Sequence, residues 1–401
     1  MIRPAFLAHV ALLSLLAGAG LGCADTSPPG AVTGRTPAAP PPDADPPLWW
    51  DAGPDDAGVT LEAAPLESPA AGPPRRTRLV SFATPPLWLG GALTGRGALL
   101  VWDAGDASRH DLVALPVSRD GKAAGAPRPV LSGPGALTSA LVARDWRRDV
   151  VLVVAYTTAG TRAARLDAAG APLGPVVELA AAPSANAAPV ASAALRTREG
   201  FLLAHADGPD TVAVTALQAD ATAPLASPHR LHLPGTRRLQ LADTGEARFL
   251  AFDGPETAGL RRLDVDAPPL PWRADVRTDL LADGDGLLAV TCLGDLPGEP
   301  GAVVAERLDA DGRPRGAPRM LAKSAVPCDF AAHLRPAGGL ALRHGRHVTR
   351  FDAALQPTGE PAYLPEGSLP GVLLWARDTA LACGLSTDAE GETLDCLALT
   401  P

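Results

Sequence analysis

Residues 308–318 read Leu-Asp-Ala-Asp-Gly-Arg-Pro-Arg-Gly-Ala-Pro, and residues 166–175 repeat the pattern as Leu-Asp-Ala-Ala-Gly-Ala-Pro-Leu-Gly-Pro. A third clear copy and several weaker ones also start on an apolar residue. Consecutive copies begin 43 to 51 residues apart, at Val117, Leu166, Leu217, Leu263, Leu308, Phe351 and Leu397. A period in this range is typical of proteins in which each repeat is one small structural unit stacked on its neighbours.

Each repeat has room for four short strands. In one unit, residues 287–293 form a nearly continuous apolar run, as expected of a strand that is covered on both faces. Residues 302–308 then alternate weakly and lead into the repeated turn, and residues 319–321 begin a further strand. Four strands in one repeat of this length make a propeller blade. The sequence therefore predicts an all-β fold, a β-propeller of seven four-stranded blades. Six or eight blades remain alternatives because three units lack a signature residue.

The recurring Asp and Gly are explained by turn chemistry. An Asp side chain can accept hydrogen bonds from backbone amides in the turn, and Gly adopts positive φ without steric cost. The sixth unit has Leu355 where the three clear copies have Gly, so its turn is expected to take another form. Asp309 and Asp311 also resemble the start of a calcium loop. Calcium needs six to eight oxygen ligands, and no glutamate follows at a suitable spacing.

The last unit ends before its own fourth strand. Residues 393–399 read as a strand and the sequence stops at Pro401. The segment Arg76–Phe82 precedes the first unit and has a suitable length and alternation. We expect it to pair with the C-terminal strand and close the ring, because an unpaired sheet edge invites aggregation.

Residues 1–22 have the features of a secretory signal. Arg3 supplies the positive charge, residues 6–16 are apolar apart from His9 and Ser14, and residues 18–22 are mostly small. The apolar run is too short for a good membrane-spanning helix. The signal ends at Cys23.

Leu21, Gly22 and Cys23 resemble the lipobox of bacterial lipoproteins, although the family prefers leucine where this chain has Gly20. The resemblance implies that Cys23 carries a lipid and becomes the first residue of the mature chain. Ala24 is similar to the residue found in lipoproteins that are sorted to the outer membrane. The expected location is the cell envelope, on its periplasmic or outer surface. Ordinary secretion with an incidental cysteine is the alternative.

Residues 23–75 are expected to be a disordered tether. This segment is rich in Pro and Ala and shows no apolar periodicity. Such a composition cannot bury enough apolar surface to offset the entropy lost on ordering. The predicted organisation is a signal at 1–22, a tether at 23–75 and the propeller at 76–401.

The composition restricts the partners and the core. The net charge is −9, both signs of charge are interspersed, and no basic patch with aromatic residues occurs, so a nucleic acid partner is not expected. Aromatic residues make up only 4% of the chain, so Leu, Val and Ala must fill the core.

Four cysteines follow Cys23, and an even number in an exported domain suggests disulfides. Cys383 and Cys396 flank an expected hairpin and could face each other, and Cys292 and Cys328 pair by elimination. No C-x-x-C spacing supports zinc.

Active-site motifs are absent from the sequence. There is no G-x-S-x-G, no P-loop and no H-E-x-x-H. Two His-x-x-His pairs occur, at His229/His232 and His344/His347. Residues three apart on a strand point to opposite faces, so chelation requires a turn, which residues 344–347 are expected to form. No catalytic, cofactor-binding or metal-binding residue is assigned.

Two further resemblances concern the fold. Residues 386–393 resemble the Asp-box hairpin of sialidase-type propellers, with one extra residue before Gly391 and in a single copy. That box has a structural role in its family. With its lipobox, Pro-rich tether and L-D-x-x-G-x-P turns, the chain as a whole resembles β-propeller lipoproteins of myxobacteria-type bacteria. This resemblance implies no defined activity and no cofactor.

Two classes of function remain open. The chain is either a non-catalytic binding or scaffold module with a protein or glycan partner, or a propeller enzyme that acts on glycans or peptidoglycan. Sugar hydrolysis needs two carboxylates across a cleft. Acidic residues are frequent in the expected loops, but few aromatic residues accompany them, so binding is favoured. The candidate carboxylates are Asp103, Asp106, Asp207, Asp210, Asp253 and Asp295.

Overall fold

The computed structural model describes residues 76–399 with short interruptions. The interruptions are residues 87, 146, 182–190, 219, 221–222, 255–257, 272–276, 285, 294–300, 325–329, 336–337, 365–367, 376–379 and 389–390. The chain divides into two units, Met1–Leu61 and Glu62–Pro401, and every described residue belongs to the second. The predicted signal, Cys23 and the predicted tether lie outside the described residues.

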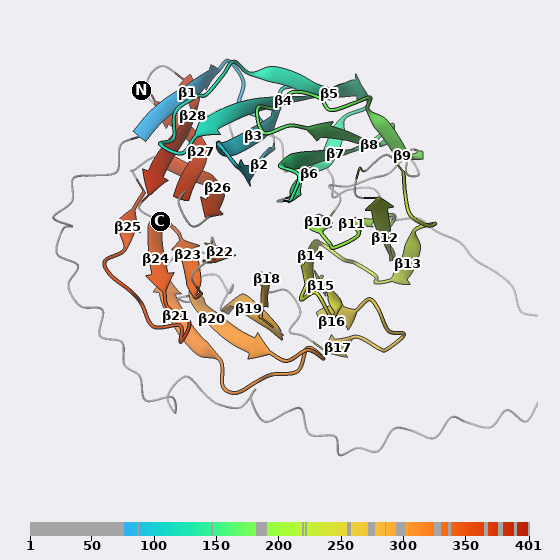
Figure 1. The fold of residues 1–401 in the computed structure, drawn as a ribbon, viewed down its shortest axis with the longest axis vertical. Coiled ribbons are helices and arrows are strands. Elements are labelled where there is room, and N and C mark those ends of the chain that lie inside the picture. The colour runs from blue at the N-terminus through green and yellow to red at the C-terminus, as the bar shows by residue number, and fades with distance from the viewer. Residues whose placement is uncertain are drawn as a thin grey trace, which may run out of the picture. The chain divides into compact units, whose positions relative to one another are not determined.

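The described residues form seven antiparallel sheets of four strands, arranged as the blades of a ring (Figure 1). Blade 1 contains β2 (Leu89–Thr94), β3 (Gly97–Asp103), β4 (Arg109–Ser118) and β5 (Arg128–Pro134). Blade 2 contains β6 (Leu137–Asp145), β7 (Val150–Thr157), β8 (Gly160–Leu166) and β9 (Val177–Ala181). Blade 3 contains β10 (Ser192–Arg196), β11 (Gly200–Ala206), β12 (Thr211–Gln218) and β13 (His229–His232).

The other four blades continue the same order. Blade 4 contains β14 (Arg238–Asp243), β15 (Arg248–Asp253), β16 (Ala258–Arg262) and β17 (Leu270–Pro271). Blade 5 contains β18 (Thr278–Asp283), β19 (Gly286–Leu293), β20 (Gly301–Leu308) and β21 (Arg319–Ser324). Blade 6 contains β22 (Phe330–Leu334), β23 (Leu340–His344), β24 (His347–Phe351) and β25 (Ala362–Tyr363). Blade 7 contains β26 (Ser368–Trp375), β27 (Ala380–Asp388), β28 (Gly391–Leu399) and β1 (Arg76–Phe82).

This architecture confirms the predicted seven-bladed β-propeller. The first strand of each repeat lies nearest the centre of the ring, and the fourth lies at the perimeter (Figure 1). The innermost strands of neighbouring blades contact one another around the ring, including β2 with β26. In the described part of the chain, no helix is long and apolar enough to cross a membrane.

The described residues form seven apolar clusters, and each cluster lies between two neighbouring blades. In the cluster between blades 1 and 2, Leu99 and Val101 of β3 pack with Val151 and Val153 of β7. The largest fully buried side chains are mostly Leu, with only a few Phe. As the composition indicated, aliphatic residues fill the core. Because residues alternate along a strand, each middle strand contributes to two clusters at once.

The repeated turn has one hydrogen-bonding pattern in three of the blades. Asp167 accepts hydrogen bonds through Oδ1 from the amides two and four residues ahead, both at 2.8 Å. Asp309 and Asp352 do the same at 2.8 to 2.9 Å. Gly170 has a φ of 77° and Gly312 a φ of 82°. In four copies the opening apolar residue is bridged to the proline that follows, as in Leu308 with Pro314, and in the copy at Val117 it is bridged to Ala123. The Asp, Gly and Pro of the repeat therefore build one compact turn.

The expectation that Leu355 changes the form of this turn is wrong. Leu355 has a φ of 59°, and its amide donates to the carbonyl of Asp352 at 2.9 Å, as the Gly312 amide does to Asp309 at 3.0 Å. A β carbon on Gly312 would lie 2.8 Å from Leu260 of the preceding blade, so a side chain there would have to displace its neighbours. Leu355 instead fits into the cluster between blades 5 and 6 and is 5% exposed. Burial of the leucine offsets the left-handed backbone, which costs about 1–2 kcal/mol.

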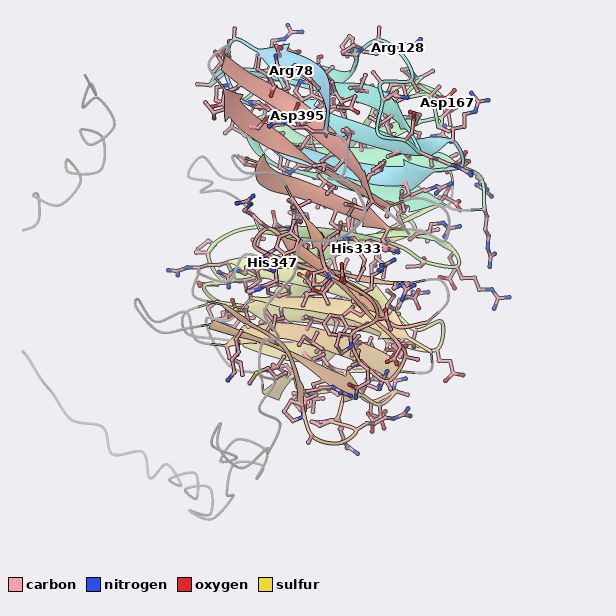
Figure 2. All side chains as sticks on the ribbon, turned by 90° about the vertical axis from the view of Figure 1, so that its left-hand side faces the viewer. Arg78, Arg128, Asp167, His333, His347 and Asp395 are labelled. Carbon is pink, nitrogen blue, oxygen red and sulfur yellow. A yellow bond between two sulfur atoms is a disulfide. The ribbon has the colours of Figure 1, made fainter. Side chains whose placement is uncertain are left out.

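Strand β1 lies beside β28 as the outermost strand of blade 7. Their antiparallel register runs from Arg76 opposite Leu397 to Phe82 opposite Glu392. Nε of Arg76 donates to Oδ2 of Asp395 at 2.8 Å, and Asp395 is buried. Figure 2 labels Asp395 on β28 and Arg78, its partner in the register, on β1. The pairing places the two ends of the described chain in one sheet, and whether it locks the ring remains a prediction.

A disulfide joins Cys383 and Cys396, which lie directly opposite each other on β27 and β28. This confirms the first predicted pair, and both cysteines are buried in the cluster between blades 7 and 1. Cys292 is also disulfide-bonded. Its expected partner, Cys328, lies outside the described residues, so that pairing remains a prediction.

Deletion of residues 76–83 should destabilise the whole ring. The deletion exposes the hydrogen-bonding edge of β28, removes Phe82 from its edge-to-face contact with Trp102 and leaves Asp395 buried without Arg76. Arg76 is 31% exposed, so loss of this ion pair should cost less than the roughly 3–5 kcal/mol of a fully buried pair. We expect a clearly lower melting temperature, or aggregation, by calorimetry. The matched control removes residues 66–73 and should melt like the intact chain. A chain that begins at Pro85 with unchanged stability would contradict the closure.

Leu355→Ala should be less stable than Leu355→Gly. Both variants lose the buried side chain, which costs about 2–4 kcal/mol, but only alanine retains the strain of a positive φ. The glycine variant should therefore be about 1 kcal/mol more stable than the alanine variant in urea denaturation. Gly312→Ala serves as a control and should be destabilised. Equal stability of the two Leu355 variants would show that the left-handed backbone is not strained there.

Candidate functional site

The ring has two faces that differ in their connections. The turn face carries the hairpins between the first and second strands and the repeated turns, such as the one at Asp167. The loop face carries the connections between the second and third strands, including residues 104–108, 207–210 and 345–346, and the passages from blade to blade. In Figure 2, Asp167 lies toward one face and His347 toward the other.

Five of the candidate carboxylates lie on the loop face. Asp103 and Asp253 end the second strands of their blades, whereas Asp106, Asp207 and Asp210 lie in loops between second and third strands. The sixth candidate, Asp295, lies outside the described residues. These five residues share a face of the ring, although they come from different blades.

Four of these carboxylates are used within their own blades, and two of the four shape the loop that follows β3. Asp103 accepts a hydrogen bond from the Gly105 amide at 3.0 Å, and Asp106 accepts from the Ser108 amide and hydroxyl, both at 2.7 Å. The Ser108 hydrogen bonds hold the pKa of Asp106 below its ordinary value.

The other two carboxylates form ion pairs across strands. Asp207 pairs with Arg230 and Asp253 pairs with Arg238, each at 3.1 Å. Together, these four carboxylates shape loops and neutralise arginines, and their contacts assign them no catalytic role.

A layer of polar side chains lies between blades 2 and 3, at the level of the loop face. We call it the polar layer; it consists of Ser139, Tyr156, Thr161, Ser192 and His205. In blade 2, Tyr156 is opposite both Ser139 and Thr161 in the strand register. In blade 3, Ser192 is opposite His205.

The polar layer caps the apolar cluster between these two blades. Alternation places Tyr156 on the same face of β7 as Val154, and His205 on the same face of β11 as Leu203. Val154 and Leu203 belong to the cluster, and Leu141 packs against it. The change from apolar to polar side chains therefore occurs within single strands, near their loop-face ends.

The contacts within the polar layer join the two blades. The hydroxyl oxygens of Ser139 and Ser192 lie 2.6 Å apart and share a hydrogen bond. The rings of Tyr156 and His205 lie 4.8 Å apart between centroids and are tilted by 33°. Both contacts bring together residues from different repeats, which a turn motif cannot encode.

Two buried polar atoms of the layer have no hydrogen-bond partner among the described residues, the hydroxyl of Tyr156 and Nδ1 of His205. Tyr156 is only 3% exposed. Burial raises the pKa of Tyr156, so the phenol stays protonated. Burial also lowers the pKa of His205, and Asp207 partly opposes this effect. A buried polar group ordinarily finds a partner, so a water or a polar ligand group is needed to satisfy these two atoms.

Two more titratable groups lie half-buried on inner strands and were missed by the sequence analysis. Oδ2 of Asp279 on β18 accepts a hydrogen bond from the Ala332 amide on β22 at 2.9 Å, and burial raises the pKa of this carboxyl. Burial lowers the pKa of His333 on β22 to about 4. For His333 the available signal was a lone titratable residue inside an apolar strand, whereas β18 also contains Asp283 and gave no such signal for Asp279.

In the calcium-like loop at Asp309, the carboxylates already bind other groups of the protein. Its Oδ1 accepts from the amides of Asp311 and Arg313, and Asp311 pairs with Arg262 at 2.9 Å. Among the described residues, no group of three or more His, Cys, Asp or Glu side chains is arranged to hold a metal ion.

Comparisons with known proteins bear on the fold alone. A solved protein from Lactobacillus plantarum is similar with a TM-score of 0.43 and 18% identity, over 70% of this chain and 86% of that one. The AfRom2 CNH domain is similar with a TM-score of 0.44 and 11% identity, over 82% of this chain and 99% of that one. Neither a protein-family model nor a curated protein matches the chain.

Acid should weaken the fold between about pH 6.5 and 4. The pKa of His333 is about 4 in the folded chain and that of His205 is also lowered, against about 6.5 when unfolded. The unfolded chain then binds more protons in this range, so stability falls as the pH falls, by at most about 1.4 kcal/mol per pH unit for each histidine. Asp279 has the opposite effect on stability. Because burial raises its pKa, this carboxyl favours the folded state as the pH falls.

Urea denaturation at several pH values measures this dependence. His333→Gln and His205→Gln should each reduce the slope, whereas His232→Gln, on an exposed residue, should leave it unchanged. Identical slopes in all four proteins would contradict the assignment to His333 and His205.

Proposed function

We propose that this chain is an envelope-anchored lipoprotein whose propeller is a non-catalytic binding or scaffold module. The signal-like residues 1–22, Cys23 and the Pro-rich segment support the anchor. The expected location is the outer membrane, with a protein or glycan as partner. The seven-bladed ring supports the binding role, because propellers present many loops from one rigid scaffold.

The polar layer is the observation that carries the binding role. The loop-face carboxylates at Asp103, Asp106, Asp207 and Asp253 are used by their own blades. In contrast, Tyr156 and His205 present polar atoms that no described residue satisfies. A neutral phenol and a neutral imidazole can each donate or accept a hydrogen bond, which suits recognition of a polar, uncharged group.

The attachment of the chain favours the loop face for recognition. Phe82 lies opposite Glu392, near the loop-face end of β28, so Arg76 lies at the opposite end of β1, toward the turn face. Because β1 is the outermost strand of its blade, the preceding chain joins the ring at its perimeter. The covalent attachment at Arg76 is therefore at the end of β1 that is farther from the loop face.

Anchoring is tested by metabolic labelling of the full-length protein with a fatty-acid analogue. The wild type should be labelled and should sediment with membranes. Cys23→Ser should lose both the label and the sedimentation. Equal labelling of the two proteins would overturn the anchor.

Binding is tested by placing a photo-crosslinking residue at Ala107 or Pro209 on the loop face, or at Arg96 or Glu246 on the turn face. All four positions are exposed. Covalent adducts between the protein and its partner should form only when the crosslinking residue is on the loop face. Adducts that form only from the turn face would contradict the proposal. Release of sugars from peptidoglycan by the purified protein would instead establish the enzyme alternative.

A further inference from the structure

The hairpin between β23 and β24 brings two histidines onto one side of a sheet. His344 and His347 flank the two-residue turn at Gly345 and Arg346 and are direct partners in the strand register. Direct partners in an antiparallel pair point to the same face, with β carbons about 4.5–5.5 Å apart. The rule that residues three apart point to opposite faces applies within one strand and so does not separate this pair.

Backbone contacts hold the tip of this hairpin. The Leu364 amide donates to the Arg346 carbonyl at 2.8 Å, and Nε of Arg346 donates to the Leu364 carbonyl at 3.0 Å. The guanidinium of Arg343 donates to the Gly345 carbonyl at 3.2 Å. Gly345 has a φ of 54°, which suits the first position of a tight hairpin turn. The two histidines therefore project from a braced element.

Two neighbouring aromatic side chains lie on the same face of the sheet as the pair. Tyr363 is opposite His347 in the register, and their rings lie 4.7 Å apart between centroids. Phe330 is opposite His344 and is fully buried. His347 is exposed and His344 is partly buried. Arg343 precedes His344 on the strand and so points to the other face of the sheet, away from the pair.

We propose that His344 and His347 bind one divalent transition-metal ion, each through an imidazole nitrogen, with water in the remaining positions. Imidazole suits Cu²⁺, Ni²⁺ and Zn²⁺, and such nitrogens bind zinc at about 2.0–2.1 Å. Two imidazoles on one face of a braced hairpin can converge on one ion. Copper should bind most tightly, in keeping with the general order of divalent affinities. This metal site is independent of the proposed binding role.

The same chain offers a matched control. His229 and His232 have the same spacing and are both exposed, but both lie within β13. Their register partners are Val214 and Thr211, and the two side chains point to opposite faces. The two pairs have the same residue type and the same spacing, but they differ in geometry and in the burial of His344.

Titration of the untagged protein with Ni²⁺, followed calorimetrically, tests the site. The wild type should bind one equivalent in a saturable manner. Either His344→Gln or His347→Gln should weaken binding at least about tenfold, since even the loss of a residue that supports a ligand costs 10–100-fold. The double variant His229→Gln/His232→Gln should bind like the wild type. Binding should also weaken in acid, because protons compete with the metal ion for the imidazole nitrogens.

Two outcomes would overturn the proposal. One is the absence of saturable Ni²⁺ binding to the wild type, and the other is binding that survives in both His344→Gln and His347→Gln. Melting temperatures of all variants establish that each is folded, and His347→Gln, on an exposed residue, should melt like the wild type. With Cu²⁺, the electron paramagnetic resonance spectrum should show coupling to two nitrogens in the wild type and fewer in each single variant.

Discussion

Each blade of this ring has two apolar faces, and a different neighbouring blade must cover each of them. The middle strands carry Leu, Val and Ala at consecutive positions, so alternation sends apolar side chains to both sides of every sheet. A flat stack of such sheets would leave its two outer faces in water. A ring removes both outer faces, and the seven clusters, one at each interface between blades, are the direct result. Burial of apolar area is the main source of stability in such a fold.

The repeated turn links the local sequence to this packing. Its hydrogen bonds are local, so the roles of Asp167 and Asp309 in the turn could be predicted from the neighbouring residues of the sequence. Its contact with the preceding blade is not local. Gly170 lies close to Leu99 of blade 1, and Gly312 lies close to Leu260 of blade 4. Leu355 could not be predicted correctly because the space available to it is set by a different repeat.

The same distinction explains which parts of the candidate site were predictable. The fold followed from the period and from apolar runs, which are properties of single repeats. The loop carboxylates were found, but their use within the blades depends on partners such as Arg230 and Arg238 across a strand pair. The polar layer was missed because Tyr156 and His205 belong to repeats that look ordinary when each is examined alone. Only the packing of blade 2 on blade 3 makes their positions unusual.

The position of β1 also determines how an anchored ring would carry mechanical load. Tension between an anchor before Arg76 and a partner on the loop face would run along β1, whose register with β28 extends from Arg76 to Phe82. The load would then fall on all the hydrogen bonds of this strand pair together, as a shear, and would not open them one at a time. The disulfide between Cys383 and Cys396 joins β28 covalently to β27, so the force would pass into the rest of blade 7. If the chain is anchored in this way, the strand pair at the perimeter would be the mechanical junction between the anchor and the ring.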